Sequence, residues 1–186
     1  MKELRTAGKV IRRITSVMLV LSVVGVLAAC QKVEADYIIR VSTQGTNSYY
    51  SISNDNLEKL SSFQYASALN SQDSEYSPYE YEFSAISIDA DGNDPADWKY
   101  SDDNGFELDP EQEQFWIEKM TSMDLPYTGT IDVMYYTFDD YLIVYAAKWG
   151  RPGGDDDLIT NVVFHNDEII GTIDERGLFD RVYKHN

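Results

Sequence analysis

The stretch Thr130–Trp149, TIDVMYYTFDDYLIVYAAKW, decides the fold of this chain, because two runs of strand-forming residues flank the dipeptide Asp139-Asp140. Valine, isoleucine, tyrosine and phenylalanine favour β-strands, and adjacent aspartates between two such runs are typical of a tight turn. We therefore predict strands over Thr130–Phe138 and Tyr141–Trp149. Strands joined by so short a connection pair in antiparallel fashion.

The same pattern continues after this hairpin. Further strands are predicted over Leu158–His165 and Ile169–Asp174, with Asn166-Asp167 as the turn between them. Gly177 then interrupts the pattern before a last short strand near Leu178–Tyr183. The C-terminal part of the chain is therefore predicted to be an antiparallel strand meander.

Strand-forming residues also gather in the N-terminal half of the chain. Tyr37–Ser42 and Tyr49–Ile52 are predicted as two early strands. A third strand begins at Tyr79, where the apolar residues first occupy odd positions and then switch to even positions at Ile86 and Ile88. This switch predicts a β-bulge, or a strand that is buried on both faces towards its end.

A short helix is predicted from the apolar residues Leu57, Leu60 and Phe63, because their spacing of three places them roughly on one helical face. Ser53 or Asp55 would serve as its N-cap.

The main helix has a clear start at Asp109-Pro110-Glu111-Gln112. Asp is a preferred N-cap, Pro suits the first helical position, and Gln three residues after the cap completes a capping box. Trp116, Met120 and Met123 form the predicted buried stripe, and Leu125-Pro126 ends the helix.

Together these elements predict an α+β fold that is mostly antiparallel sheet. We expect five to seven strands in one sheet, including the C-terminal strand meander, with one main helix packed on one face. A single domain is expected over residues 37–186, since a chain of this length supports one hydrophobic core.

The first thirty residues have the three parts of a secretory signal. Basic residues come first, the uncharged stretch Ile14–Ala29 follows, and small residues precede Cys30, the only cysteine of the chain. The uncharged stretch has sixteen residues, fewer than the ~20 that a helix needs to cross the hydrocarbon core. We therefore expect residues 1–29 to be a removed signal peptide, with a retained anchor as the alternative.

The residues Leu27-Ala28-Ala29-Cys30 resemble the lipobox of bacterial lipoproteins. This resemblance implies that the Cys30 thiol receives a diacylglycerol, that cleavage precedes Cys30, and that residues 30–36 form a lipidated tether. It implies an extracytoplasmic domain attached to the cell membrane by lipid. A mature chain without other cysteines favours a single-membrane bacterium, with an outer membrane as the alternative. The resemblance covers residues 1–30 only.

The chain without residues 1–29 is strongly acidic. Five of the fifteen Lys and Arg residues and one of the thirty-two acids lie in the signal, so ten bases and thirty-one acids remain, a net charge of −21. Such a surface repels nucleic acid and anionic lipid headgroups. The composition therefore excludes a nucleic-acid partner and favours cationic partners, such as calcium or a basic protein surface.

An acidic loop is predicted over Asp89–Gly105, and its first residues could bind calcium. Asp89, Asp91, Asn93 and Asp94 place hard oxygen ligands within six residues. The spacing departs from that of an EF-hand loop, which has glycine at the sixth position and glutamate at the twelfth. A solvated turn, whose side chains bond their own backbone, is the alternative interpretation.

A second candidate is the loop after Trp149, which contains Arg151 and the carboxylates Asp155, Asp156 and Asp157. Loops on a rigid sheet often carry binding residues. A polar hairpin loop without a specific ligand is the alternative.

The sequence favours a binding function over catalysis. His165 and His185 have no serine or cysteine partner in a recognisable motif, and no phosphate loop or metalloprotease helix is present. A hydrolase with a carboxylate pair remains a less favoured hypothesis, because acids are too numerous for any one pair to be informative.

We therefore expect a membrane-anchored lipoprotein whose domain binds a protein or peptide partner, of an accessory, adhesion or exclusion and immunity type. The alternative is a calcium- or glycan-binding module. No cofactor is required apart from the candidate calcium ion, and the sequence does not indicate the oligomeric state.

Overall fold

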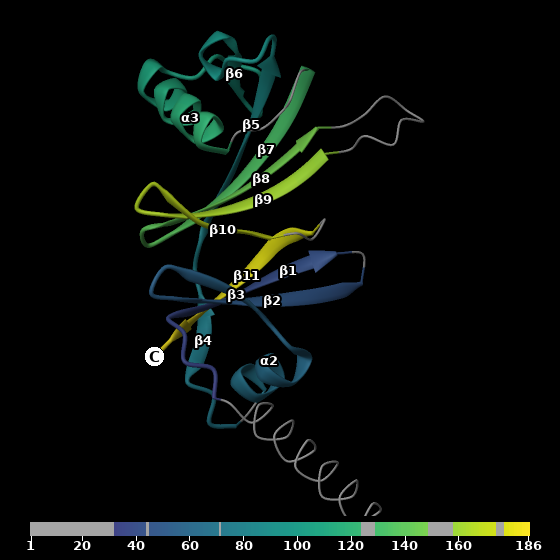
Figure 1. Cartoon of the computed structure of the whole chain (residues 1–186), viewed down its shortest axis with the longest axis vertical. Helices are drawn as coiled ribbons and strands as arrows, with labels where there is room; N and C mark the ends of the chain where they lie inside the picture. The colour runs from purple at the N-terminus through teal and green to yellow at the C-terminus, as the bar shows by residue number, and fades with distance from the viewer. Residues whose placement is uncertain (1–31, 44, 71, 124–128, 149–157, 174–176) are drawn as a thin grey trace, which may run out of the picture. The chain divides into compact units, whose positions relative to one another are not determined.

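The computed structural model describes residues 32–43, 45–70, 72–123, 129–148, 158–173 and 177–186 (Figure 1). Strands make up 57% of the described residues, so the fold is predominantly β. The contacts within the chain define two units. The larger comprises Ala35–Lys59 and Tyr76–Asn186, and the smaller contains Leu60–Glu75 together with residues up to Glu34.

The first sheet of the larger unit is antiparallel, with the strand order β10-β9-β8-β7-β5-β6. Its strands are β5 (Glu82–Ala90), β6 (Lys99–Asp102), β7 (Gly129–Phe138), β8 (Tyr141–Lys148), β9 (Leu158–His165) and β10 (Glu168–Ile173).

The predicted meander is confirmed in this sheet. Phe138 pairs with Tyr141 across the turn Asp139-Asp140. The second turn has positive φ at both central residues, 47° at Asn166 and 71° at Asp167. This conformation matches the right-handed twist of a hairpin, and Asn and Asp tolerate it well.

The second sheet has the order β3-β2-β1-β11-β4. Its strands are β1 (Tyr37–Thr43), β2 (Thr46–Ser53), β3 (Asn56–Leu60), β4 (Tyr76–Tyr79) and β11 (Leu178–His185). The last strand, β11, leaves the meander and pairs with β1 and β4. The expectation of a single sheet of five to seven strands is therefore wrong, since the described strands form two sheets.

Two sheets form because the central strands are apolar on both faces. Along β7, Ile131 and Val133 join one core, whereas Tyr136 and Phe138, on the opposite face, join another. The second core also contains residues of β1, β2 and β11, so the second sheet packs against this face of the first. Each apolar face must be removed from water by another layer.

The other face of the first sheet carries the main helix, α3 (Pro110–Met123), as predicted. Asp109 Oδ1 accepts hydrogen bonds from the amides of Glu111 and Gln112 at 3.0 and 2.9 Å, which confirms the N-cap. Trp116 and Met120 are buried in the first core. Figure 1 shows α3 beside β5 and β6. The predicted helix end at Leu125-Pro126 lies outside the described residues.

The predicted helix through Leu57, Leu60 and Phe63 is wrong. Asn54 and Asp55 adopt left-handed φ values of 47° and 62° and form a tight turn into β3. The spacing of the apolar residues fits both a helix and an edge strand, so it did not distinguish between them.

In the smaller unit, α2 (Ser62–Leu69) begins instead after Ser61. The Ser61 side chain accepts from the Gln64 amide, and the Gln64 side chain accepts from the Ser61 amide, forming a capping box. Within this unit Lys32 and Glu75 form an exposed ion pair at 2.7 Å.

The predicted strand from Tyr79 is divided between the two sheets. Tyr79 ends β4, and β5 begins at Glu82 and pairs with β7 in an unbroken register. The change of apolar phase falls later, between Ala85 and Ile86 inside β5, where this register has no break, so the predicted β-bulge is wrong. Ile86 and Ile88 are buried in the first core, whereas Phe83 is exposed.

The predicted acidic loop Asp89–Gly105 is also more ordered than expected. It contains the 3₁₀ helix η1 (Pro95–Asp97) and β6, whose Tyr100 is buried together with Trp98. These two aromatic rings belong to the core beneath α3.

Among the described residues, no helix is both long and apolar enough to cross a membrane.

Close packing of the two sheets is tested by Gly171 of β10. A Cβ atom there would lie 2.9 Å from Leu57 Cδ2 and 3.1 Å from Leu57 Cβ, on β3. We expect Gly171→Val to lower the free energy of unfolding by about 1–3 kcal/mol, because the two strands must separate. Thr172→Val, an exposed neighbour on the same strand, is the control. Equal urea midpoints for the two variants would contradict this packing.

Candidate functional site

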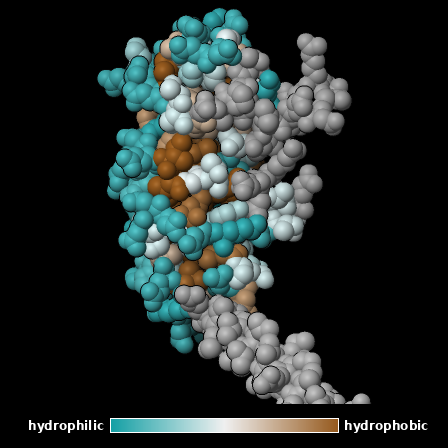
Figure 2. Space-filling view, in the orientation of Figure 1, coloured by the Kyte–Doolittle hydropathy of each residue, from teal (hydrophilic) through white to brown (hydrophobic). Residues whose placement is uncertain are grey.

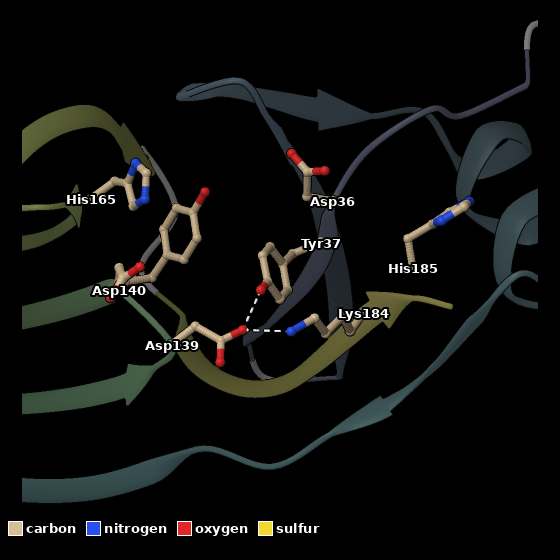
Figure 3. Close-up of a pocket in the computed structure, with 8 residues that line it drawn as sticks. Asp36, Tyr37, Asp139, Asp140, His165, Lys184 and His185 are labelled. Carbon is tan, nitrogen blue, oxygen red and sulfur yellow. Dashed lines mark hydrogen bonds and ion pairs between the residues drawn. The ribbon is translucent and has the colours of Figure 1, made fainter.

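An open pocket of about 600 Å³ lies where the β7–β8 turn meets the second sheet (Figure 3). It collects side chains from the start of β1, the β7–β8 turn, the ends of β8 and β9, and the C-terminal end of β11. The residues that line it are Asp36, Tyr37, Asp139, Asp140, Tyr141, His165, Lys184 and His185.

Asp139 is the centre of the hydrogen bonding in this pocket. Its Oδ2 accepts from Lys184 Nζ at 2.7 Å and from the Tyr37 hydroxyl, as the dashed lines in Figure 3 show. Its Oδ1 accepts from the Tyr79 hydroxyl at 2.7 Å. Asp139 occupies a left-handed turn position with φ of 44°. The tight turn therefore presents the carboxylate to donors of the second sheet.

These donors fix the protonation states of the cluster. Hydrogen bonds from Lys184, Tyr37 and Tyr79 lower the pKa of Asp139 to about 2. Burial and then the hydrogen bond to Asp139 raise the pKa of Tyr37, and the Asp139 carboxylate raises the pKa of Lys184. At neutral pH Asp139 is therefore ionised, whereas Tyr37 and Lys184 keep their protons. None of the three is poised as a general acid or base near pH 7.

His165 forms a second link between the sheets at the edge of the pocket. Its Nδ1 pairs with Asp55, which belongs to the β2–β3 turn. The imidazole stacks on Tyr141, with ring centroids 4.3 Å apart and planes 14° apart. The Asn166 amide lies 3.1 Å from Nε2, which fits donation to that nitrogen by Asn166 and donation by Nδ1 to Asp55.

The two histidines lie at opposite ends of the pocket in Figure 3. His185 contacts Tyr76 edge-on, with centroids 5.1 Å apart and planes 81° apart. Since the histidines are separated, they are not placed to act on one reacting atom. The described residues that line the pocket include no serine, threonine or cysteine.

Asp36 and Asp140 add two further carboxylates to the pocket. Both are exposed, and within the part of the chain that the structure describes neither side chain forms a hydrogen bond or ion pair. Burial, followed by the charges of Asp55, Asp36 and other neighbours including Asp140, raises the pKa of Tyr141 to about 12. The carboxylates thus create a negative potential around this hydroxyl, which favours a cationic group.

The lining of the pocket is mainly polar. Hydrophilic residues cover much of the face seen in Figure 2, and hydrophobic residues gather near the middle of that view, over the region of β10 in Figure 1. Ile169 of β10 is one of the exposed large hydrophobic residues.

The predicted calcium residues do not meet at this pocket. Asp94 accepts from the Ala96 amide at 3.0 Å and caps η1. Asp89 lies on β5 opposite Lys99, and Asp91 and Asn93 belong to the exposed turn between β5 and η1. Among the described residues, no group of three or more His, Cys, Asp or Glu side chains is arranged to hold a metal ion. Calcium binding stays a prediction.

The other predicted site residues lie outside the described residues. They are Cys30 and the loop residues Trp149, Arg151, Asp155, Asp156 and Asp157.

The pocket itself was not predicted from the sequence. Asp139-Asp140 was interpreted only as a turn, and His165 and His185 were considered only as catalytic residues. The available signal was the presence of a histidine or an aspartate pair at the ends of successive predicted strands, which lie at one edge of a meander.

Comparison with protein-family models, with curated proteins and with solved structures found no match for this chain.

The Asp139 cluster predicts a defined dependence of stability on pH. The pKa of Asp139 is lowered from 3.8 to about 2, so its stabilising contribution is present above about pH 4 and is lost as the pH falls through about 2. We expect Asp139→Asn to lower the free energy of unfolding by about 1 kcal/mol at pH 7, a value reduced for solvent screening. The difference from wild type should shrink between pH 4 and pH 2.

Asp140→Asn is the matched control, because the same charge is removed from the neighbouring turn residue. Urea unfolding of the three proteins at pH 7, 4 and 2.5 provides the measurement. A constant difference between wild type and Asp139→Asn at all three pH values would contradict the role assigned to the carboxylate.

Proposed function

We propose that the chain is a membrane-anchored, extracytoplasmic bacterial lipoprotein whose acidic domain binds a basic region of a protein or peptide partner. The observation that carries the proposal is the open pocket, where the exposed carboxylates of Asp36 and Asp140 form no hydrogen bond or ion pair within the described residues, and where Lys184 is bound to Asp139. A lysine or arginine side chain of a partner would neutralise these carboxylates and would enter a pocket large enough for it.

The charge of the whole chain supports the same partner class. The predicted mature chain has a net charge of −21 by composition, which accelerates encounter with a basic surface and disfavours acidic competitors. The lipid proposed at Cys30 would hold the domain at the membrane and raise its local concentration there. An accessory, adhesion or immunity role is compatible with these properties.

The lipid anchor predicts the mass of the mature protein. We expect the chain purified from its bacterial membrane to lack residues 1–29 and to carry diacylglycerol on Cys30. Cys30→Ser should retain residues 1–29 and carry no lipid, because a hydroxyl is a far weaker nucleophile than a thiol at this position. Intact-mass spectrometry distinguishes these forms, with Gln31→Ser as the control. A wild-type chain with an intact N-terminus and a free Cys30 thiol would contradict the proposal.

Partner binding predicts a loss of capture when the pocket loses its charge. We expect the double variant Asp36→Asn, Asp140→Asn to recover much less cross-linked partner from intact membranes than wild type. The control is Asp73→Asn, Asp103→Asn, which removes the same charge from exposed residues that do not line the pocket.

Quantitative mass spectrometry of the cross-linked proteins provides the comparison. If the two double variants recover the same partners in the same amounts as wild type, the pocket is not the binding site. If both double variants lose the partner equally, the overall charge of the domain, and not the pocket, determines partner binding.

A further inference from the structure

A second pocket of about 400 Å³ shares Asp139 with the first. Tyr37 and Lys184, which line the first pocket, bind Asp139 Oδ2, whereas Tyr79, which lines the second, binds Oδ1. The Asp139 carboxylate therefore stands between the two pockets and is held from both sides. The residues that line the second pocket are Tyr79, Glu80, Tyr81, Glu82, Thr137, Phe138 and Asp139.

The second pocket combines aromatic rings with the carboxylates of Glu80 and Glu82, and Tyr81 is its partly exposed ring. Tyr81 packs edge-on against Phe179 at 5.0 Å and against Tyr136 at 5.8 Å between ring centroids. Its hydroxyl donates to the Asp180 carbonyl at 3.1 Å. These contacts hold the Tyr81 ring in place on the surface, where it offers a rigid apolar face to a ligand.

Phe83 extends this aromatic surface beyond the pocket. It lies two residues after Tyr81, and its ring centroid is 5.2 Å from that of Tyr136, which Tyr81 also contacts. Its side chain is 57% exposed. A large aromatic ring exposed beside a rigid aromatic wall is typical of a surface that contacts an apolar group of a partner.

We propose that the two pockets form one site for an extended peptide segment that carries a cationic side chain near an apolar one. The cationic side chain occupies the pocket of Asp36 and Asp140, and the apolar side chain packs on Tyr81 and Phe83. An extended chain directs neighbouring side chains in different directions, so that one segment can reach two adjacent pockets. This inference rests on the proposed function and specifies the chemistry of its partner.

The charges favour a peptide over a carbohydrate. A neutral glycan would pack on the aromatic surface, but it has no cation to neutralise Asp36 and Asp140 in the adjoining pocket. A basic, partly apolar peptide satisfies both pockets at once.

The test uses the full chain in a nonionic detergent and measures binding by calorimetry. The probes are a hexapeptide of alternating arginine and phenylalanine, a hexapeptide of alternating arginine and alanine, and chitohexaose. Phe83→Ala is paired with Phe106→Ala, since the Phe106 side chain is also exposed, at 71%, but belongs to the segment after β6 and not to the β5 segment beside Tyr81. Asp140→Asn is paired with Asp103→Asn. Melting temperatures confirm that each variant is folded.

We expect Asp140→Asn to weaken both peptides about fivefold to tenfold, because each loses a charge pair. Phe83→Ala should weaken the phenylalanine peptide about fivefold or more and leave the alanine peptide unchanged, since only the first has a ring to pack there. The two control variants should bind like wild type.

Equal effects of Phe83→Ala and Phe106→Ala on the phenylalanine peptide would overturn the two-pocket site. Binding of chitohexaose that depends on Phe83 and exceeds binding of the peptides would overturn the peptide class as well. Both results leave the proposed function standing if membrane capture still requires Asp36 and Asp140. Loss of that requirement, with peptide binding intact, would instead remove the proposed function.

Discussion

The structure depends on the burial of both faces of β7, β8 and β9. Side chains alternate across a strand, so a run such as Ile131–Phe138 sends apolar groups to both sides of the sheet. One face is covered by α3, and the other by the second sheet. The pocket lies where the second covering layer meets the end of the first sheet, and its position therefore follows from the same constraint.

The two hairpin turns at this end of the sheet attach its covering layers. Asp139 of the β7–β8 turn binds Lys184 of β11 at 2.7 Å, and Asp167 of the β9–β10 turn binds Lys119 of α3 at 2.5 Å. The turns are themselves joined, because the Asn166 amide donates to the Asp140 carbonyl at 3.1 Å. The second sheet and α3 are thus each joined to the first sheet by an ion pair in addition to apolar packing. Lys119 in addition lies over the ring of Phe164, 4.9 Å from its centroid.

Local features of the sequence predicted the elements well but not their arrangement. The meander and the start of α3 were predictable because alternation, turn residues and the cap at Asp109 lie within a few residues of each other. The second sheet was not, because its central pairing joins distant residues. Arg40 and Asp180, which form a two-point ion pair across β1 and β11, are 140 residues apart in the sequence. No local pattern encodes such a contact.

The pocket was hidden for the same reason. Tyr37 and Asp139 are 102 residues apart, and Asp55 and His165 are 110 apart. Each residue taken singly suits an ordinary role, as a strand tyrosine, a turn aspartate or a strand-end histidine. Only the packing of the two sheets brings them to one site. The apolar phase change near Ile86 was visible in the sequence, but a bulge and a change in which face of one regular strand is apolar give the same pattern.

The most direct test of peptide binding across the two pockets is an NMR titration with the arginine–phenylalanine hexapeptide. The full chain is used in nonionic detergent, with its tyrosine rings labelled with ¹³C. The chain has fourteen tyrosines, so the affected rings identify the site. If the peptide occupies both pockets, we expect shifts at Tyr37, Tyr79, Tyr81 and Tyr141, and none at Tyr49 or Tyr65. Shifts confined to Tyr49 and Tyr65, or spread evenly over all the tyrosines, would contradict it.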